Sequence, residues 1–137
     1  MINITIIDTG CANLSSVKFA FDRLGYNTEI TFDLNKIKSA DKLILPGVGT
    51  ANAAMYNLQE RQLIETIQNL TQPVLGICLG MQLMTEFSEE GNVPTLNLIS
   101  GKTNRIPDTG LPLPQMGWNR VQFVKNCPLF DGIVQNS

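Results

Sequence analysis

Short apolar runs alternate with amphipathic stretches over roughly the first 90 residues of the chain. Three of the runs predict strands at residues 2–7, 42–45 and 73–77, and a stretch rich in β-branched residues predicts another at residues 28–32. Between them, apolar positions spaced three and four apart predict helices, one carrying Leu14, Val17, Phe21 and Leu24, one around residues 63–70 and one over residues 79–87. Strands that alternate with helices form βαβ units, and continuous apolar runs indicate strands buried on both sides. The pattern therefore predicts an α/β fold with an open, mainly parallel, doubly wound sheet.

The pattern changes after about residue 90, where glycines and prolines become dense and the helical periodicity ends. We expect loops and a β-rich insertion there, with possible strands at residues 96–100 and 121–124. The whole chain of 137 residues is the length of one domain, so residues 1–137 are predicted to form a single one.

Charge and composition exclude several classes of protein. Ten basic and twelve acidic residues are interspersed and give a net charge of −2, which argues against a nucleic-acid-binding surface. The apolar runs are too short to span a membrane, and the N-terminal residues lack the basic and apolar regions of a signal peptide. These features predict a cytoplasmic protein.

Cysteine and histidine usage restricts the chemistry further. The three cysteines, Cys11, Cys78 and Cys127, fit neither a disulfide framework nor a CxxC metal site, and we expect reduced thiols. The chain contains no histidine, so it cannot by itself hold a Cys-His dyad or a His-ligated metal. We expect no metal and no cofactor.

The strongest motif surrounds Cys78. A predicted apolar strand leads into Gly-Ile-Cys-Leu-Gly at residues 76–80, and a predicted helix follows. This is the G-x-nucleophile-x-G elbow with Cys in place of Ser, and Gly76 and Gly80 supply room where a side chain would clash. The turn would place the thiol at the carboxyl edge of the sheet, with the N–H of Leu79 directed at an oxyanion. The alternative is a buried strand cysteine beside two ordinary turn glycines.

Residues 76–82 resemble the nucleophile motif of the class I (triad) glutamine amidotransferases. Asp-Thr-Gly at residues 8–10 with Asn13 and Ser16, Pro-Gly-Val-Gly at 46–49 and Pro-Gln-Met-Gly-Trp-Asn at 114–119 narrow the resemblance further. Within that family these motifs are similar to those of the glutaminase subunits of histidine biosynthesis, from residue 1 to about residue 131. The resemblance implies a flavodoxin-like fold.

The resemblance also implies an activity and a partner. Such a subunit hydrolyses glutamine to glutamate and ammonia, which passes to a (β/α)8-barrel cyclase subunit in a heterodimer. The family's triad is Cys, His and Glu, and its His and Glu would follow residue 137. We therefore expect a C-terminally truncated chain that has the nucleophile, Cys78, and is inactive alone.

The resemblance assigns roles to residues around the elbow. The N–H of Val48 would be the second oxyanion donor, beside that of Leu79, and Gly47, Gly49 and Gln82 would bind glutamine. Because glycines flank Val48, the Gly47–Val48 peptide can rotate at little steric cost. We expect the resting subunit to hold this peptide turned away, with the oxyanion hole incomplete. Without the resemblance, the simpler interpretation of residues 46–49 is an ordinary strand-to-loop turn. The simpler interpretation of Gln82 is a solvated helix residue.

A second group of residues is assigned to the partner interface by resemblance: Asn13, Met116, Trp118 and Asn119. Alternatives stay open, because Asn13 could be a helix cap and a lone tryptophan is most often part of a core. Cys11 and Cys127 are expected to be structural thiols. The glutamates at positions 86, 89 and 90 are expected to form a solvated helix end.

Two other functions compete with this one. The chain could belong to another class I amidotransferase, such as those of anthranilate or pyridoxal phosphate synthesis, although the Gly-Trp-Asn segment argues against it. It could also be a non-catalytic module that binds a synthase barrel.

Overall fold

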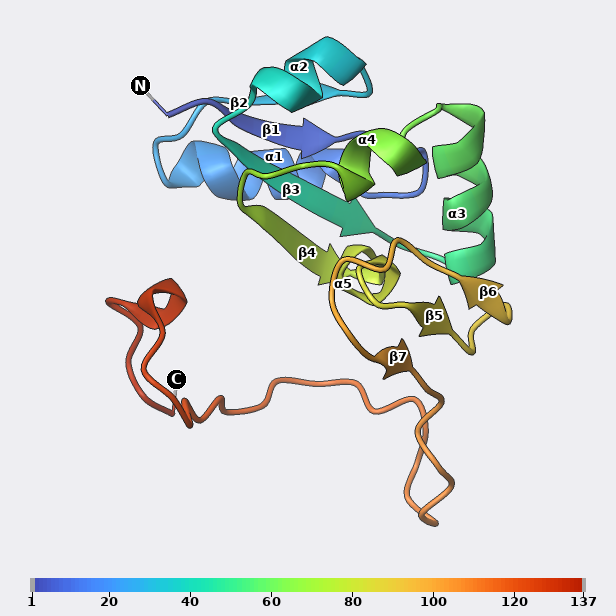
Figure 1. The fold of residues 1–137 in the computed structure, drawn as a ribbon. Helices are drawn as coiled ribbons and strands as arrows, with labels where there is room; N and C mark the ends of the chain where they lie inside the picture. Colours follow the sequence, from blue (N-terminus) through green and yellow to red (C-terminus); the bar gives the residue numbers. More distant parts are fainter. Residues whose placement is uncertain (1, 137) are drawn as a thin grey trace. The chain divides into compact units, whose positions relative to one another are not determined.

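Four parallel strands form the central sheet in the order β2-β1-β3-β4 (Figure 1). The structure is a computed structural model that describes residues 2–136. The strands are β1 (Ile4–Ile7), β2 (Thr28–Thr31), β3 (Lys42–Gly47) and β4 (Val74–Cys78). The α/β class, the parallel sheet and all four predicted strands are confirmed, with ends that differ by one or two residues.

Helices cover both faces of the sheet. On one face, α1 (Leu14–Arg23) packs Leu14, Val17 and Phe21 against a core of β1 and β3 side chains. On the other face lie α2 (Leu34–Ser39), α3 (Ala51–Glu60), α4 (Ile64–Gln68) and α5 (Leu79–Leu83), which share the larger core cluster. The doubly wound arrangement is therefore confirmed. Leu24 does not join the α1 stripe, because the helix ends before it and its side chain is exposed.

Two of these helices were not predicted. Helix α2 begins after Asp33, whose carboxylate accepts hydrogen bonds from the N–H groups of Asn35 and Lys36. Helix α3 begins after Thr50, whose hydroxyl accepts from the N–H of Ala53. Each N-cap satisfies N–H groups that have no partner within the helix.

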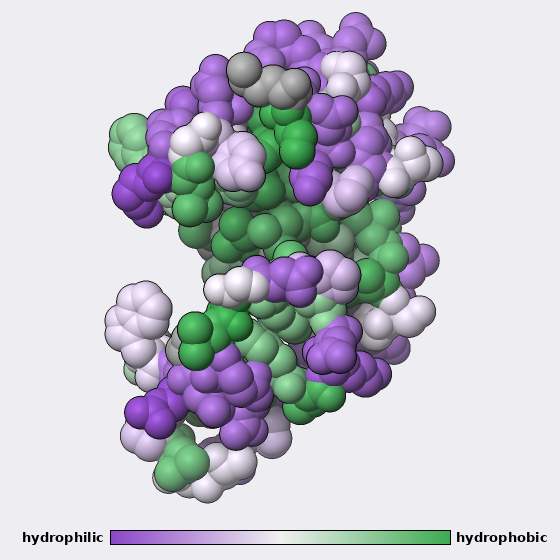
Figure 2. Space-filling model, turned by 90° about the vertical axis from the view of Figure 1, so that its left-hand side faces the viewer, coloured by the Kyte–Doolittle hydropathy of each residue, from purple (hydrophilic) through white to green (hydrophobic). Residues whose placement is uncertain are grey.

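Strand β4 departs from the prediction of burial on both sides. It pairs only with β3 among the described residues, and Leu75 and Ile77 are exposed. Leu75 is the register partner of Ile44 in β3, so it lies on the α1 face of the sheet, beside the core that α1 forms with β1 and β3 side chains. Figure 2 shows hydrophobic side chains gathered on one face of the molecule.

A small second sheet follows α5, with strands β5 (Phe87–Ser88), β6 (Val93–Pro94) and β7 (Lys102–Thr103) in the order β6-β5-β7. It confirms the β-rich insertion but places its strands differently. Residues 96–100 and 121–124 are not strands, and the third predicted helix ends at Leu83 instead of residue 87. Strands of two residues are too short to produce a periodic sequence signal.

The chain divides into two compact units, Met1–Arg105 and Ile106–Ser137. In the second unit, a short 3-10 helix, η1 (Pro128–Phe130), lies near Phe123, whose ring stacks on that of Phe130 with centroids 4.3 Å apart. Within the described residues, no helix is long and apolar enough to cross a membrane.

Candidate active site

Strand β4 ends at Cys78, and α5 begins at the next residue. Cys78 has φ 54° and ψ −118°, a conformation that is costly for a residue with a Cβ, and its side chain is exposed. Strained backbone of this kind is concentrated at functional sites. The predicted elbow is therefore present as a strand, a strained turn and a helix.

The two glycines of the elbow lie where a side chain cannot fit. A Cβ on Gly80 would lie 1.7 Å from the carbonyl oxygen of Leu45 in β3, and one on Gly76 would lie 2.7 Å from the Cα of Met81. Both distances are far below van der Waals contact, so the steric role predicted for these glycines is confirmed.

The Pro-Gly-Val-Gly segment runs beside the elbow. In the β3–β4 ladder Gly47 is the register partner of Cys78, so Val48 and Gly49 follow next to the thiol-bearing turn. A Cβ on Gly47 would lie 3.0 Å from both the Cβ of Leu79 and the N of Gly80. Gly49 has φ +95°, a conformation that favours glycine.

The two N–H groups predicted to form the oxyanion hole differ in availability. Leu79 is the first residue of α5, so its N–H has no acceptor within that helix. The N–H of Val48 donates to the carbonyl oxygen of Cys11 at 2.6 Å. In this conformation the Val48 donor is therefore engaged by the β1–α1 loop, as expected for a peptide that is turned away.

Gln82 lines a cavity of about 510 Å³ one helical turn beyond Cys78. Its side-chain amide donates to Ser88 Oγ at 2.6 Å and to Glu90 Oε2 at 3.0 Å. The remaining lining residues are mostly polar or charged: Glu89, Glu90, Thr103, Asn104 and Arg105. The carboxylates of Glu89 and Glu90 and the guanidinium of Arg105 thus all line the cavity.

The three glutamates do not form a helix end, which corrects the prediction, because α5 ends at Leu83. Glu86 accepts from the N–H of Gly101, and Glu89 accepts from the N–H of Arg105 at 2.7 Å. These bonds connect residues on either side of β5 to the segment around β7. The contribution of Glu90 to the cavity was not predictable from the sequence, because a run of glutamates has the same appearance on any solvated surface.

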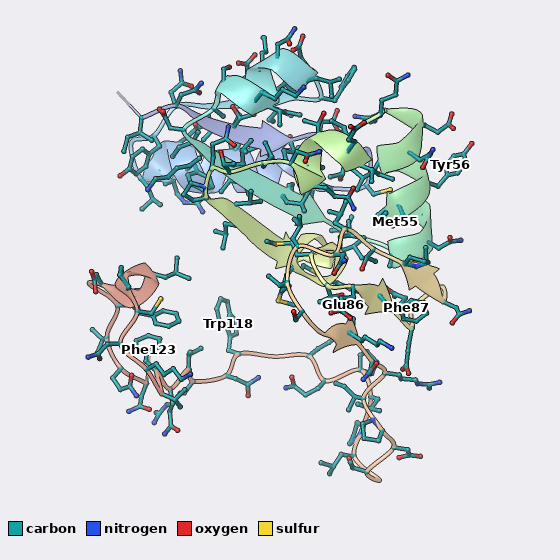
Figure 3. All side chains as sticks on the ribbon, in the orientation of Figure 1. Met55, Tyr56, Glu86, Phe87, Trp118 and Phe123 are labelled. Carbon is teal, nitrogen blue, oxygen red and sulfur yellow. The ribbon has the colours of Figure 1, made fainter. Side chains whose placement is uncertain are left out.

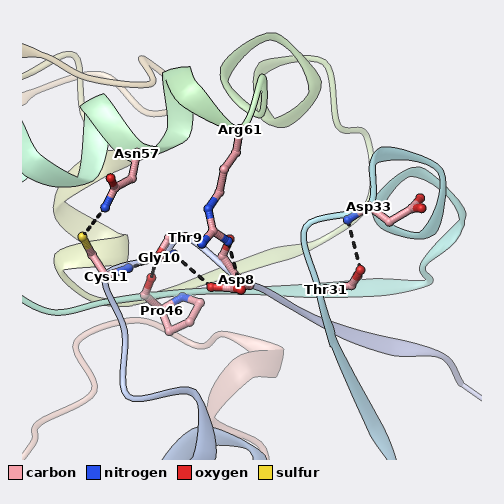
Figure 4. Close-up of polar contacts among 9 residues, drawn as sticks. All are labelled: Asp8, Thr9, Gly10, Cys11, Thr31, Asp33, Pro46, Asn57 and Arg61. Carbon is pink, nitrogen blue, oxygen red and sulfur yellow. Dashed lines mark hydrogen bonds and ion pairs between the residues drawn. The ribbon is translucent and has the colours of Figure 1, made fainter.

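A polar network connects α3 to the loop of residues 8–11 (Figure 4). Arg61, the residue after α3, forms an ion pair with Asp8 and also donates to the carbonyl oxygen of Asp8 at 2.8 Å. Asn57 donates to the sulfur of Cys11 at 2.7 Å. Sequence reasoning missed Asn57 and Arg61 because it did not predict the helix that positions them.

The residues assigned to the partner interface are exposed. Asn13 is the N-cap of α1 and accepts from the N–H of Ser16, so its capping role is confirmed. In the second unit, Met116, Trp118 and Asn119 are exposed, and the Trp118 side chain is fully accessible (Figure 3). Trp118 is therefore not part of a core in the described structure. Cys127 is exposed and precedes η1.

The ionisable groups of the described residues do not indicate a metal site, because nowhere do three or more His, Cys, Asp or Glu side chains gather to hold an ion. One clear electrostatic effect lies away from the elbow, where a hydrogen bond and the charge of Glu29 raise the pKa of Lys36.

Comparison with known proteins agrees with this geometry. The family model of the class-I glutamine amidotransferases matches residues 5–136, and the chain belongs to that family. The chain is 99% identical to the imidazole glycerol phosphate synthase subunit HisH of Haemophilus influenzae (strain 86-028NP) over 137 residues, which cover 100% of the chain and 69% of that relative.

Two further relatives are likewise named imidazole glycerol phosphate synthase subunit HisH. HisH of Mannheimia succiniciproducens is 73% identical over 96% of the chain and 68% of its own length. HisH of Pasteurella multocida is 70% identical over 100% of the chain and 69% of its own length.

Proposed function

We propose that this chain carries the nucleophile and the substrate cavity of the glutaminase subunit of imidazole glycerol phosphate synthase. The observation that carries the proposal is the strained elbow at Cys78, which is in register with Gly47 of the Pro-Gly-Val-Gly segment. Family membership and the HisH names of the relatives support the same conclusion.

In the proposed reaction, Cys78 Sγ attacks the carboxamide carbon of glutamine and forms a tetrahedral intermediate. The C–N bond then breaks, the nitrogen takes up a proton and ammonia leaves, while the acyl group stays on sulfur as a thioester. Water attacks the thioester, releases glutamate and restores the thiol. The resemblance assigns the proton transfers to a His and a Glu outside these 137 residues.

The oxyanion of the intermediate requires N–H donors beside Cys78. The N–H of Leu79 is one, and the N–H of Val48 becomes the second when the Gly47–Val48 peptide rotates away from Cys11. Removing one oxyanion donor typically costs about 10²–10³ in rate. The conformation with Val48 bonded to Cys11 is accordingly the slow state of the enzyme.

The charged cavity suits the amino-acid end of glutamine. Glutamine carries an α-ammonium and an α-carboxylate. The cavity offers the carboxylate of Glu90 to the ammonium and the guanidinium of Arg105 to the carboxylate. Gln82 would position Glu90 through its hydrogen bond and contact the substrate itself. Gly47 and Gly49 would contact the substrate on the other side of the thiol.

The ammonia would pass to a (β/α)8-barrel cyclase subunit, which forms imidazole glycerol phosphate and aminoimidazole carboxamide ribotide. Asn13, Met116, Trp118 and Asn119 are proposed to contact that subunit, supported by their exposure. A cytoplasmic location is proposed as well, supported by three cysteines that form no disulfide.

The test replaces Cys78 in the full-length subunit bound to its cyclase. Because only glutamine hydrolysis uses the thiolate, Cys78→Ser should abolish glutamine-dependent synthesis and leave ammonia-dependent synthesis largely intact. Steady-state rates with each nitrogen source distinguish the two activities. Cys127→Ser is the matched control, since Cys127 is exposed and lies outside the elbow. Equal loss of both activities in Cys78→Ser would contradict the proposal.

A further inference from the structure

We propose that Asn57 and Arg61 are positioning residues for the resting state of the enzyme: they fix the carbonyl of Cys11 that holds the N–H of Val48. The inference rests on the proposed function, because it concerns the oxyanion donor of that reaction. It assigns a role to two polar side chains at the end of α3 that, within residues 2–136, hydrogen-bond to the loop of residues 8–11 and not to the elbow or the cavity.

The first step is the placement of the two donors. Asn57 and Arg61 are four residues apart at the C-terminal end of α3, so they lie on one side of the helix, one turn from each other. Asn57 reaches Cys11 Sγ at 2.7 Å, and Arg61 reaches Asp8 at two oxygens, the carbonyl at 2.8 Å and the carboxylate at 2.9 Å. The loop of residues 8–11 is thus held at both ends (Figure 4).

The second step concerns the geometry of Arg61. Its guanidinium lies over the ring of Phe32, 4.9 Å from the centroid, and against Gly10, where a Cβ would be 3.0 Å from Nη2. Gly10 has φ +74° and no side chain, so it lets the guanidinium approach the loop backbone. The side chains of Asp8 and Arg61 are only 23% and 30% exposed, so solvent screens their pairing less than that of a typical surface pair.

The third step connects the loop to β3. Thr9 is fully buried, and its hydroxyl donates to the carbonyl of Pro46 and accepts from the N–H of Cys11. The carbonyl of Cys11 in turn accepts from Val48 at 2.6 Å. Cys11 therefore contacts Asn57 of α3 through its sulfur and Val48 through its carbonyl oxygen.

The energetic consequence follows from the Val48–Cys11 bond, which the peptide must break to turn towards Cys78. The Val48–Cys11 bond exists only while the peptide is turned away, and a contact shifts an equilibrium only if it differs between states. An acceptor held in place binds its donor with less loss of entropy than a mobile one. Asn57 and Arg61 therefore stabilise the resting state by holding the acceptor, without touching the peptide itself.

The experiment uses Asn57→Leu in the full-length subunit bound to its cyclase. We expect the glutaminase kcat without cyclase ligand to rise by about 3- to 10-fold, as for the loss of one net hydrogen bond. The ligand-stimulated kcat and the KM for glutamine should stay unchanged, so the activation by ligand falls by the same factor. Amide hydrogen exchange of Val48, measured by NMR, should become faster. Gln59→Leu is the control, because Gln59 is exposed on the same helix and outside the network.

Cys11→Ala provides a second route if Asn57→Leu folds poorly, because it removes the sulfur and keeps the carbonyl. It should raise the unstimulated rate similarly, and adding Asn57→Leu to it should add little, since both changes break the same contact. Folded variants with wild-type unstimulated rates and wild-type Val48 exchange would overturn the inference. If the subunit hydrolyses no glutamine at all, the proposed function fails, and the exchange of Val48 still decides whether Asn57 holds the loop.

Discussion

Glu90 carries a negative charge into the cavity beyond the elbow, where the amide of Gln82 donates to it at 3.0 Å. A carboxylate beside an amide donor and an open cavity keeps acceptor capacity for a further cation. The α-ammonium of glutamine is the cationic group that the proposed substrate supplies. We therefore expect the Glu90 carboxylate to bind the α-ammonium of glutamine.

Replacing Glu90 with Gln tests this role. The change keeps the size of the side chain and removes its charge, so the KM for glutamine should rise by about 10-fold or more, with a smaller effect on kcat. Glutaminase kinetics of the ligand-stimulated full-length enzyme measure both values. Glu86→Gln is the control, because the Glu86 carboxylate accepts from the backbone N–H of Gly101 and is not among the residues that line the cavity in the described part of the chain. Unchanged KM in a folded Glu90→Gln enzyme would exclude contact with the ammonium.

The functional residues differ in how far the sequence could reveal them. Cys78 was predictable because glycines at fixed offsets and a strand-to-helix context accompany it. Glu90 and Asn57 were not, because their roles depend on partners that are distant along the chain or unmarked by any motif: Asn57 contacts a residue 46 positions away.

Among the elements, helix α5 packs unusually close to the sheet. Gly80 lies against the backbone of Leu45, and Leu79 and Leu83 fill the core on that face. The close approach fixes where α5 begins and so where the thiol of Cys78 is held. Position 80 consequently tolerates no side chain.

We expect Gly80→Ala to lower the free energy of unfolding by about 2 kcal/mol or more, because the added methyl must displace α5 from β3. Urea unfolding of variant and wild type measures the change. Gly25→Ala serves as the control: Gly25 has positive φ, +81°, which Gly80 does not have, and nothing lies within 4 Å of an added Cβ. The control should therefore show backbone strain without a steric clash, and wild-type stability of Gly80→Ala would argue against the packing explanation.

The strands were more predictable than the helices, for a physical reason. The runs of β1, β3 and β4 are apolar enough to be recognised without context, and β2 is rich in β-branched residues. The buried face of α3, in contrast, consists of Ala51, Ala54 and Leu58. Alanine contributes little to a periodic pattern although it packs well in a helix. The strands of the second sheet are two residues long and have no period to detect.

At the scale of the whole molecule, the match to the family model extends over both compact units, from residue 5 to residue 136. The two units differ in how they bury apolar side chains. The first has two core clusters, whereas the second leaves Met116, Trp118 and Val124 exposed. Exposed aromatic and methionine side chains are typical of interface centres.

Trp118→Ala should weaken association with the cyclase by about 2 kcal/mol, roughly 30-fold in Kd, the size expected for an interface hot spot. The Tm of the isolated full-length subunit should not change, because the Trp118 side chain is fully exposed. Binding calorimetry and thermal unfolding measure the two quantities. Val124→Ala is the comparison, as Val124 is exposed in the same unit. A lower Tm with unaltered Kd would assign Trp118 to packing instead.

The positive φ at Cys78 also bears on how this sequence can evolve. Backbone strain at one residue costs on the order of 1–3 kcal/mol, a large fraction of the margin by which most domains stay folded. Glycine would adopt the same turn with little strain, so selection for stability alone would favour glycine at position 78. The retention of a strained cysteine there means that the rest of the fold must be stable enough to tolerate it, and that drift elsewhere in the core is correspondingly restricted.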